Sequence, residues 1–399
     1  MTTTRHPSRP PYPAETCTQS ITVPFEYPVV FTRNLLTVDN PLLADVIDRL
    51  GENRRHRALV AVDSGLIAAR GDLQRQIKEY FHAHPTRLEL AALVVLPGGE
   101  AAKTGWDVVR DVMWTIGSTH LDRQSFVVAF GGGAMLDMVG FAASIVHRGL
   151  RLIRVPTTTL AQGDGGVGVK NGMDEHGQKN FVGTFAPPFA VINDLDFLTT
   201  LTQRDWIGGA AEAFKVAIIQ DAEFFDFLCK SAPALAGRDD NAMEQTIRRC
   251  ALLHMKHICS SGDPFEFGSA RPLDFGHWIG HKLEVMSDFA IGHGQGAAIG
   301  IAADSCYARR TGLLDEDQLR RILKGLLACG LPIFHELLVR RTADGTLEIL
   351  QGLDEFREHL GGRLTVTLPD GIGRKVEVHQ MDPGLIEQSV DFLRRMAAK

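Results

Sequence analysis

The chain has 399 residues, 44% hydrophobic and 23% charged, which is enough to build two ordinary cores. The 48 acidic and 42 basic residues give a formal net charge of −6, and no long basic run could follow a nucleic-acid backbone, so we expect no nucleic-acid partner. No window approaches 18 consecutive apolar residues and no signal peptide opens the chain, so we expect a cytoplasmic protein without a membrane segment.

The first half of the chain alternates strand-like and helix-like patterns. Residues 1–20 are rich in Pro, Thr and Ser and predict a flexible tail. Residues 21–32 predict a strand or hairpin, and residues 40–50 a helix. Five short apolar runs then predict strands with helices between them, at residues 58–62, 93–96, 125–130, 152–155 and 189–192. This alternation predicts a doubly wound, Rossmann-like parallel sheet, which we assign to residues 21–198.

The second half of the chain has mainly helical sequence patterns. Long helical patterns cover residues 206–220, 242–259 and 281–308, with few strand signals between them. A short β-like segment at residues 364–368 and a closing helix at residues 383–397 complete the chain. We therefore expect a boundary near residues 195–205 and an all-helical C-terminal domain, or at least a mainly helical one, over residues 199–399.

A glycine run marks a candidate cofactor site. Gly131, Gly132 and Gly133 stand where a predicted strand passes into a helix, a position at which backbone N–H groups can hold a diphosphate. The run is not the GxGxxG fingerprint, and it could serve close packing alone. Asp63 ends an earlier strand and could bind a ribose hydroxyl or cap a helix.

A carboxylate and several imidazoles form a candidate metal site. Glu212, His277 and His293 would leave coordination positions open for substrate or water, as in a catalytic zinc-type site. Spacing alone favours a different pair, because His277 and His281 are i,i+4 and share a helix face. Since the chain has 15 histidines, any single one could also be structural.

Longer motifs resemble a known family. GGGAMLDMVGFAAS, VPTTTLAQGDGGVGVKNG, KNFVGTF and GGAAEAFK resemble the dehydroquinate-synthase-like sugar phosphate cyclases, and the resemblance spans about residues 97–305. It implies an NAD that stays bound through the reaction. The residues that the resemblance assigns to NAD are Glu100, Lys103, Gly131, Gly132, Gly133, Asp137, Thr157 and Thr158.

The same resemblance assigns the metal ligands and the residues around substrate. It implies one divalent metal, zinc or cobalt, held by Glu212, His277 and His293, and it moves His281 to the substrate. The residues implied in catalysis are Asp164, Lys170, Lys215, Lys256 and His281. Those implied in binding a small-molecule sugar phosphate are Arg148, Lys179, Asn180, Glu266 and Asp274, with Arg148 reaching across a homodimer interface.

Two departures from the family pattern bear on activity and substrate. Family members usually read HGE where this chain has His293-Gly294-Gln295, and a neutral amide there can still make hydrogen bonds around the ligand. Dehydroquinate synthases use an Arg for the substrate carboxylate where this chain has Ala270, although Arg271 lies one residue away, and they have an Asn where this chain has Asp274.

The segments at residues 272–277, 356–362 and 371–379 look more like the sedoheptulose 7-phosphate cyclases. The resemblance therefore implies cyclisation of sedoheptulose 7-phosphate to a valiolone-type cyclitol, by transient oxidation, phosphate elimination, reduction, ring opening and an intramolecular aldol reaction. Three alternatives stay open: a 3-dehydroquinate synthase, an iron-type polyol dehydrogenase and a non-catalytic relative.

Overall fold

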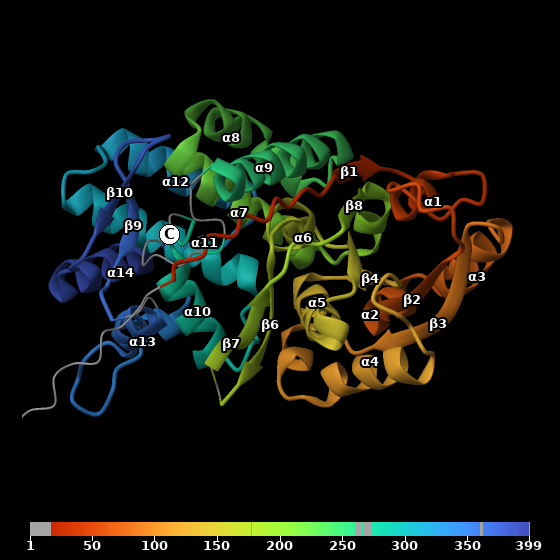
Figure 1. Cartoon of the computed structure of the whole chain (residues 1–399). Coiled ribbons are helices and arrows are strands. Elements are labelled where there is room, and N and C mark those ends of the chain that lie inside the picture. The colour runs from red at the N-terminus through yellow and green to blue at the C-terminus, as the bar shows by residue number, and fades with distance from the viewer. Residues whose placement is uncertain (1–16, 177, 261–264, 266–272, 360–361, 399) are drawn as a thin grey trace, which may run out of the picture.

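A six-stranded parallel sheet forms the core of the first half of the chain (Figure 1). The computed structural model describes residues 17–176, 178–260, 265, 273–359 and 362–398, so most of the predicted tail lies outside the described residues. The strand order is β1-β8-β5-β4-β2-β3, and every neighbouring pair is parallel. The strands of this sheet are β1 (Val29–Thr32), β2 (His56–Asp63), β3 (Leu88–Leu96), β4 (Phe126–Gly131), β5 (Arg151–Pro156) and β8 (Ala190–Asp194).

Helices cover both faces of this sheet, because alternate strand residues are apolar on each side. Val60 and Val128 pack toward one face with helices α1 to α3, whereas Leu59 and Val127 pack toward the other with α4 and α5. The helices of this half are α1 (Leu42–Ile47), α2 (Ser64–Ala69), α3 (Leu73–Ala83), α4 (Asp107–Ser118), α5 (Gly133–Ile145) and α6 (Thr159–Gly163). The predicted doubly wound sheet is confirmed.

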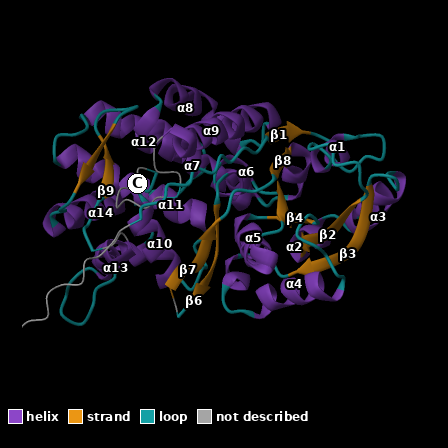
Figure 2. Ribbon diagram, viewed as in Figure 1, coloured by secondary structure: helices purple, strands orange, loops and turns teal. Residues whose placement is uncertain are grey.

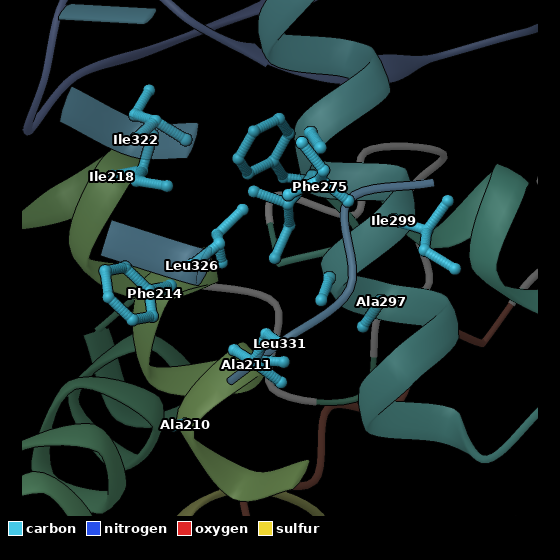
Figure 3. Close-up of a cluster of buried hydrophobic side chains, with 14 of the residues drawn as sticks. Ala210, Ala211, Phe214, Ile218, Phe275, Ala297, Ile299, Ile322, Leu326 and Leu331 are labelled. Atoms are coloured by element: carbon cyan, nitrogen blue, oxygen red, sulfur yellow. The ribbon is translucent and has the colours of Figure 1, made fainter. Parts of the chain in front are cut away.

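Helices dominate the second half of the chain (Figure 2). Their common core gathers apolar side chains from α7, α11 and α12, as the close-up in Figure 3 shows. The helices are α7 (Gln203–Gln220), α8 (Ala222–Ala236), α9 (Asp240–Ser260), α10 (His277–Met286), α11 (His293–Arg310), α12 (Glu316–Ala328), α13 (Gln351–His359) and α14 (Pro383–Ala397). Within the described ranges, no helix is both long and apolar enough to span a bilayer.

Two antiparallel hairpins correct the sequence-based picture. β6 (Lys170–Glu175) pairs with β7 (Gln178–Phe185), outside the main sheet, and Figure 1 shows this hairpin beside α5 and α10. β9 (Val366–Pro369), which confirms the β-like segment predicted at residues 364–368, pairs with β10 (Lys375–Val378), so the second half is mainly helical and not all-helical. The polar residues of β6 and β7 hide the apolar alternation by which strands are recognised in sequence.

Two further expectations were wrong in detail. Only the last four residues of the segment 21–32 form a strand, because Pro24 and Pro28 cannot donate to a ladder. The helical pattern over residues 281–308 breaks between α10 and α11, where Asp288 and Phe289 have φ of 50° and 61°. This break places His293 at the first position of α11.

Candidate active site

Three side chains from three helices of the second half converge on one point. Glu212 lies in the middle of α7, His277 is the first residue of α10, and His293 is the first residue of α11. Glu212 Oε1 is 3.6 Å from His277 Nε2 and 3.4 Å from His293 Nε2. One ligand atom from each side chain can be chosen so that all three lie within 4.8 Å of one another, which is close enough to share a metal ion.

Glycine contacts allow these helices to come so close. A Cβ on Gly300 of α11 would lie 1.9 Å from the carbonyl oxygen of Gly276, the residue before His277. A Cβ on Gly294 would lie 2.5 Å from Gly208 Cα of α7. Because such distances exclude any side chain, backbone meets backbone at both contacts. The positions of His277 and His293 relative to Glu212 therefore depend on these glycines.

The far nitrogen of each histidine is engaged, so the near nitrogen faces Glu212. His293 Nδ1 lies 2.6 Å from Glu284 Oε1, and His277 Nδ1 lies 3.1 Å from the Phe275 carbonyl oxygen. A carboxylate or carbonyl behind the imidazole is the usual support of a metal-ligating histidine. Both oxygens of Glu212 are buried, and Oε2 pairs with Lys215. This donor set fits a divalent cation.

The surroundings of the trio shift the pKa values of its three side chains in different directions. Burial would lower the pKa of His293, but the charge of Glu284 and hydrogen bonds with Glu212 and Glu284 raise the pKa to about 10. Burial and the Lys215 charge lower the pKa of His277. Burial would raise the pKa of Glu212, yet Lys215 and His277 hold that pKa below its usual value. An ionised carboxylate is therefore ready for a cation at this point.

A chain of ion pairs runs from the trio toward the sheet. Lys179 of β7 pairs with Glu284 and, at 2.8 Å, with Glu100. Burial would lower the pKa of Lys179, but these two carboxylates raise it. Next to this pair, Lys103 binds Asp137 at 2.8 Å and also contacts Asn180. Five of the residues predicted to bind NAD or substrate thus lie in one polar cluster: Glu100, Lys103, Asp137, Lys179 and Asn180.

The predicted cofactor edge lies at the C-terminal ends of β4 and β5. Gly131 ends β4, Gly132 is the N-cap of α5 without any side-chain cap, and Gly133 faces open space. Thr157 donates its backbone N–H to the Gly131 carbonyl oxygen at 3.0 Å, and Thr158 caps α6 through Ala161 N. The uncapped N-terminus of α5 offers free N–H groups to a diphosphate.

Asp164 and Lys215 adjoin the trio on its other side. Lys215 pairs with Glu212 and lies 3.3 Å from Asp164, whose other oxygen is 2.9 Å from His254 Nδ1. Burial would raise the pKa of Asp164, but His254 and Lys215 hold it well below its usual value. Lys170 begins β6, a few residues along the chain from Asp164.

The remaining predicted residues differ in their surroundings. The His281 ring lies 5.2 Å from that of His277, so it adjoins the trio. Asp63 caps α2 by accepting from Gly65 N at 2.7 Å, which is the capping alternative, and its ribose role stays a prediction. Lys256 and Arg148 are exposed, on α9 and after α5, and Glu266 lies outside the described residues.

Sequence reasoning missed two residues of the site. Glu284 follows His277 by seven residues and His281 by three, so a helical wheel of α10 could have found it on the same face. His254 of α9 belongs to none of the motifs that the sequence offered. Gln295, the departure from the family pattern, accepts the Gly292 N–H at 3.2 Å and so caps the helix that begins with His293.

The fold combines a doubly wound parallel sheet with a helical half that contains a candidate metal site. The N-terminal model of the 3-dehydroquinate synthase family matches residues 93–208, and its C-terminal model matches residues 209–352. The chain therefore belongs to the 3-dehydroquinate synthase family of sugar phosphate cyclases.

Individual relatives carry two different names. The 3-dehydroquinate synthase of Paracoccus denitrificans is 36% identical over 75% of this chain and 80% of its own length. That of Shewanella halifaxensis is 30% identical over 92% of this chain and 96% of its own length. The solved structure of ValA, a 2-epi-5-epi-valiolone synthase from Streptomyces hygroscopicus with NAD⁺ and Zn²⁺ bound, is 30% identical, with a TM-score of 0.84 over 95% of this chain and 100% of that chain.

Proposed function

We propose that this protein is an NAD- and divalent-metal-dependent cyclase that converts sedoheptulose 7-phosphate into a valiolone-type C7 cyclitol and releases phosphate. Membership in the sugar phosphate cyclase family supports the reaction type, and the likeness to ValA over nearly the whole of both chains supports the substrate. We further propose that it acts as a homodimer in the cytoplasm, with Arg148 of one subunit serving the other's site.

The charge of Asp274 is the observation that carries the choice of substrate. Asp274 precedes His277 by three residues, and its charge acts on both Lys215 and His277. A negative charge at the edge of the metal trio repels the carboxylate of a carboxylated substrate, and sedoheptulose 7-phosphate has no carboxylate. The sequence also has Ala270 in place of a carboxylate-binding Arg, and a charge-assisted hydrogen bond contributes about 1.5–3 kcal/mol.

The residues present fit both cofactors. Gly131–Gly133, the Thr157–Thr158 segment and the Glu100, Lys103 and Asp137 cluster would hold NAD, and Glu212, His277 and His293 would hold zinc or cobalt. Bound NAD supplies reversible hydride uptake, and the metal supplies polarisation of the oxygen that is oxidised and reduced.

The chain's own residues supply charge and proton handling. Burial would lower the pKa of Lys215, but Asp164 and Glu212 raise it, so Lys215 stays cationic and can stabilise negative charge that develops on substrate. Burial lowers the pKa of His281 well below its usual value, so its neutral imidazole can accept a proton. Lys170, Lys179 and Asn180 lie on the β6–β7 hairpin, where we place the phosphorylated sugar, with Lys256 contributing from α9 and Glu266 from the segment before His277.

A second candidate is a 3-dehydroquinate synthase, because the relative of 36% identity has that name. The two candidates share all of the chemistry above and differ in whether the substrate has a carboxylate. Arg271, next to Ala270 in the sequence, is the residue that would then bind that carboxylate.

One incubation separates the candidates. Purified protein is supplied with NAD⁺, Zn²⁺ or Co²⁺, and either sedoheptulose 7-phosphate or the carboxylated seven-carbon sugar phosphate of 3-dehydroquinate synthases. We expect phosphate release and a C7 cyclitol, identified by NMR, from the first substrate only. Asp274→Asn should reduce the ratio of the rates with sedoheptulose 7-phosphate and with the carboxylated sugar phosphate. Asp317 is an exposed carboxylate on α12, so Asp317→Asn should leave this ratio unchanged. Turnover of the carboxylated sugar alone would refute the proposal.

A further inference from the structure

Arg154 is a fully buried arginine in the middle of the sheet half. It lies on β5, two residues before Pro156, and none of its surface is exposed. Its guanidinium turns toward the segment 164–171, which carries Asp164 and Lys170. Nη1 donates to the carbonyl oxygens of Gly168 at 2.9 Å, Gly166 at 3.3 Å and Gly165 at 3.4 Å. Nη2 donates to Lys170 O and to Asn171 Oδ1, each at 2.7 Å.

Among the described residues, the guanidinium is stabilised by dipoles and not by a direct ion pair. Burial lowers the pKa of Arg154, and its hydrogen-bond acceptors are four backbone carbonyls and one side-chain amide. A buried charge is tolerated only where hydrogen bonds replace its hydration. Five acceptors therefore have to be held in place around it. The same hydrogen bonds that stabilise the charge must also fix the backbone that supplies them.

The segment 164–171 needs these hydrogen bonds to hold one conformation, because three of the five residues between Asp164 and Lys170 are glycine. Between Asp164 and Lys170 the chain reads Gly-Gly-Val-Gly-Val, and glycine contributes no side chain to packing and the greatest backbone freedom. A Cβ on Gly166 would lie 2.4 Å from the Ala161 carbonyl oxygen, so bulk cannot be added there. Asn171, at the far end, is itself held by the Ala186 carbonyl oxygen at 3.2 Å.

We propose that Arg154 is a positioning residue, which fixes the segment 164–171 and thereby places Asp164 beside Lys215 and the metal trio, and Lys170 at the start of β6. This inference rests on the proposed function in that both residues act on substrate. Arginine is required because its planar fork reaches five acceptors in two directions, whereas a lysine ammonium has three donors at a single atom.

The variant Arg154→Lys tests the proposal, with Arg151→Lys as the matched control. Arg151 lies on the same strand and pairs with Glu52 away from the site. At a temperature where both variants are fully folded, we expect kcat of Arg154→Lys to fall by about 10- to 100-fold, as small misplacements of catalytic groups do. The dissociation constant for NAD⁺ should stay unchanged, because the glycine turn at the end of β4 is untouched. The control should keep both values.

Hydrogen exchange gives a second measurement that needs no substrate. In the wild-type protein, the Val167 amide, bonded to Asp164 O at 3.0 Å, should exchange about as slowly as amides of β5. In Arg154→Lys, exchange should quicken over residues 165–171 and not over α5. Fast exchange at Val167 in the wild type, or a folded Arg154→Lys with wild-type kcat, would overturn the inference. Activity is measured on whichever of the two sugar phosphates the wild type converts, and the exchange result stands if it converts neither.

Discussion

Glu284 determines which nitrogen of His293 can reach a metal. Its carboxylate lies 2.6 Å from Nδ1, which leaves Nε2 for the point shared with Glu212 and His277. It also contacts Lys179 of the β6–β7 hairpin, so one buried carboxylate supports the metal trio and the predicted substrate lysine together. Burial would raise the pKa of Glu284, but His293 and Lys179 hold it far below its usual value.

Glu284→Gln should weaken metal binding. The amide keeps the size of the carboxylate but removes the charge that orients and strengthens the imidazole, so we expect affinity to fall about 10- to 100-fold. Competition with a chromophoric chelator measures the change. Glu355→Gln is the control. Glu355 lies on α13 and pairs with Lys282 of α10, the helix of Glu284, but the Glu355 side chain is exposed. Equal metal affinities in the wild type and in Glu284→Gln would show that the contact between Glu284 and His293 does not contribute to metal binding.

Asp304 is a second buried carboxylate, and it anchors the start of α10. Its oxygens accept from Gly276 N at 3.1 Å and from the Trp278 indole at 3.0 Å, one residue to either side of His277. Burial raises the pKa of Asp304 to about 7. The folded protein therefore binds a proton more tightly than the unfolded chain does, and the associated stability is present below about pH 4 and lost as pH rises through 7.

Asp304→Asn should remove this pH dependence. Relative to the wild type, the metal-free variant should gain about 2–3 kcal/mol of unfolding free energy between pH 5 and pH 8, on top of a constant cost for the altered hydrogen bonds. Urea denaturation at both pH values measures it. Asp111→Asn, an exposed carboxylate on α4, should show no such change. An identical pH dependence in the wild type and Asp304→Asn would mean that Asp304 is ionised throughout.

At the scale of elements, the glycine contacts of α7, α10 and α11 decide whether the ligands can meet. Gly300→Ala would place a methyl group 1.9 Å from the Gly276 carbonyl oxygen, so the two helices must separate. We expect a loss of about 1–3 kcal/mol in unfolding free energy. Metal affinity should fall with it, because Gly276 precedes His277.

Gly117→Ala is the matched control, since this glycine in α4 has no atom within 4 Å of an added Cβ. It should gain about 0.5–1 kcal/mol from the better helix propensity. Urea unfolding compares the two variants. A neutral Gly300→Ala would show that α10 and α11 can move apart at no cost.

The sequence predicted regular elements well where one physical rule dominated. The parallel strands are apolar on both faces, so β2, β4 and β5 stood out as short apolar runs. The β6–β7 hairpin did not, because β6 is buried although its residues are mostly polar or glycine, and β7 is largely exposed. The pairing of His293 with His277 instead of His281 was also beyond spacing rules. It depends on a helix break at residues 287–292 and on contacts between helices that lie far apart in the sequence.

At the scale of the molecule, the metal trio belongs wholly to the helical half and the glycine turn to the sheet half. A metal ion at 100 times its dissociation constant should stabilise the folded state by about 2.7 kcal/mol. For a unit of 150–250 residues, each kcal/mol raises the melting temperature by about 2–4 °C. We expect Zn²⁺ or Co²⁺ to produce such a rise and a chelator to reverse it.

His277→Ala should abolish the rise, while His82→Ala, an exposed histidine on α3, should retain it. Differential scanning calorimetry with and without metal is the measurement. If the halves melt separately, only the transition of the helical half should move. A rise of equal size in His277→Ala would place the ion elsewhere.

The backbone contacts of Gly276 with Gly300 and of Gly208 with Gly294 limit how the metal site can change during evolution. Such contacts contain no side chain whose gradual replacement could reshape them, so the metal-binding geometry is passed on intact or lost altogether. Asp274, which we propose to face substrate, is free of that constraint. A lineage can therefore exchange one sugar phosphate for another while inheriting the same reaction centre.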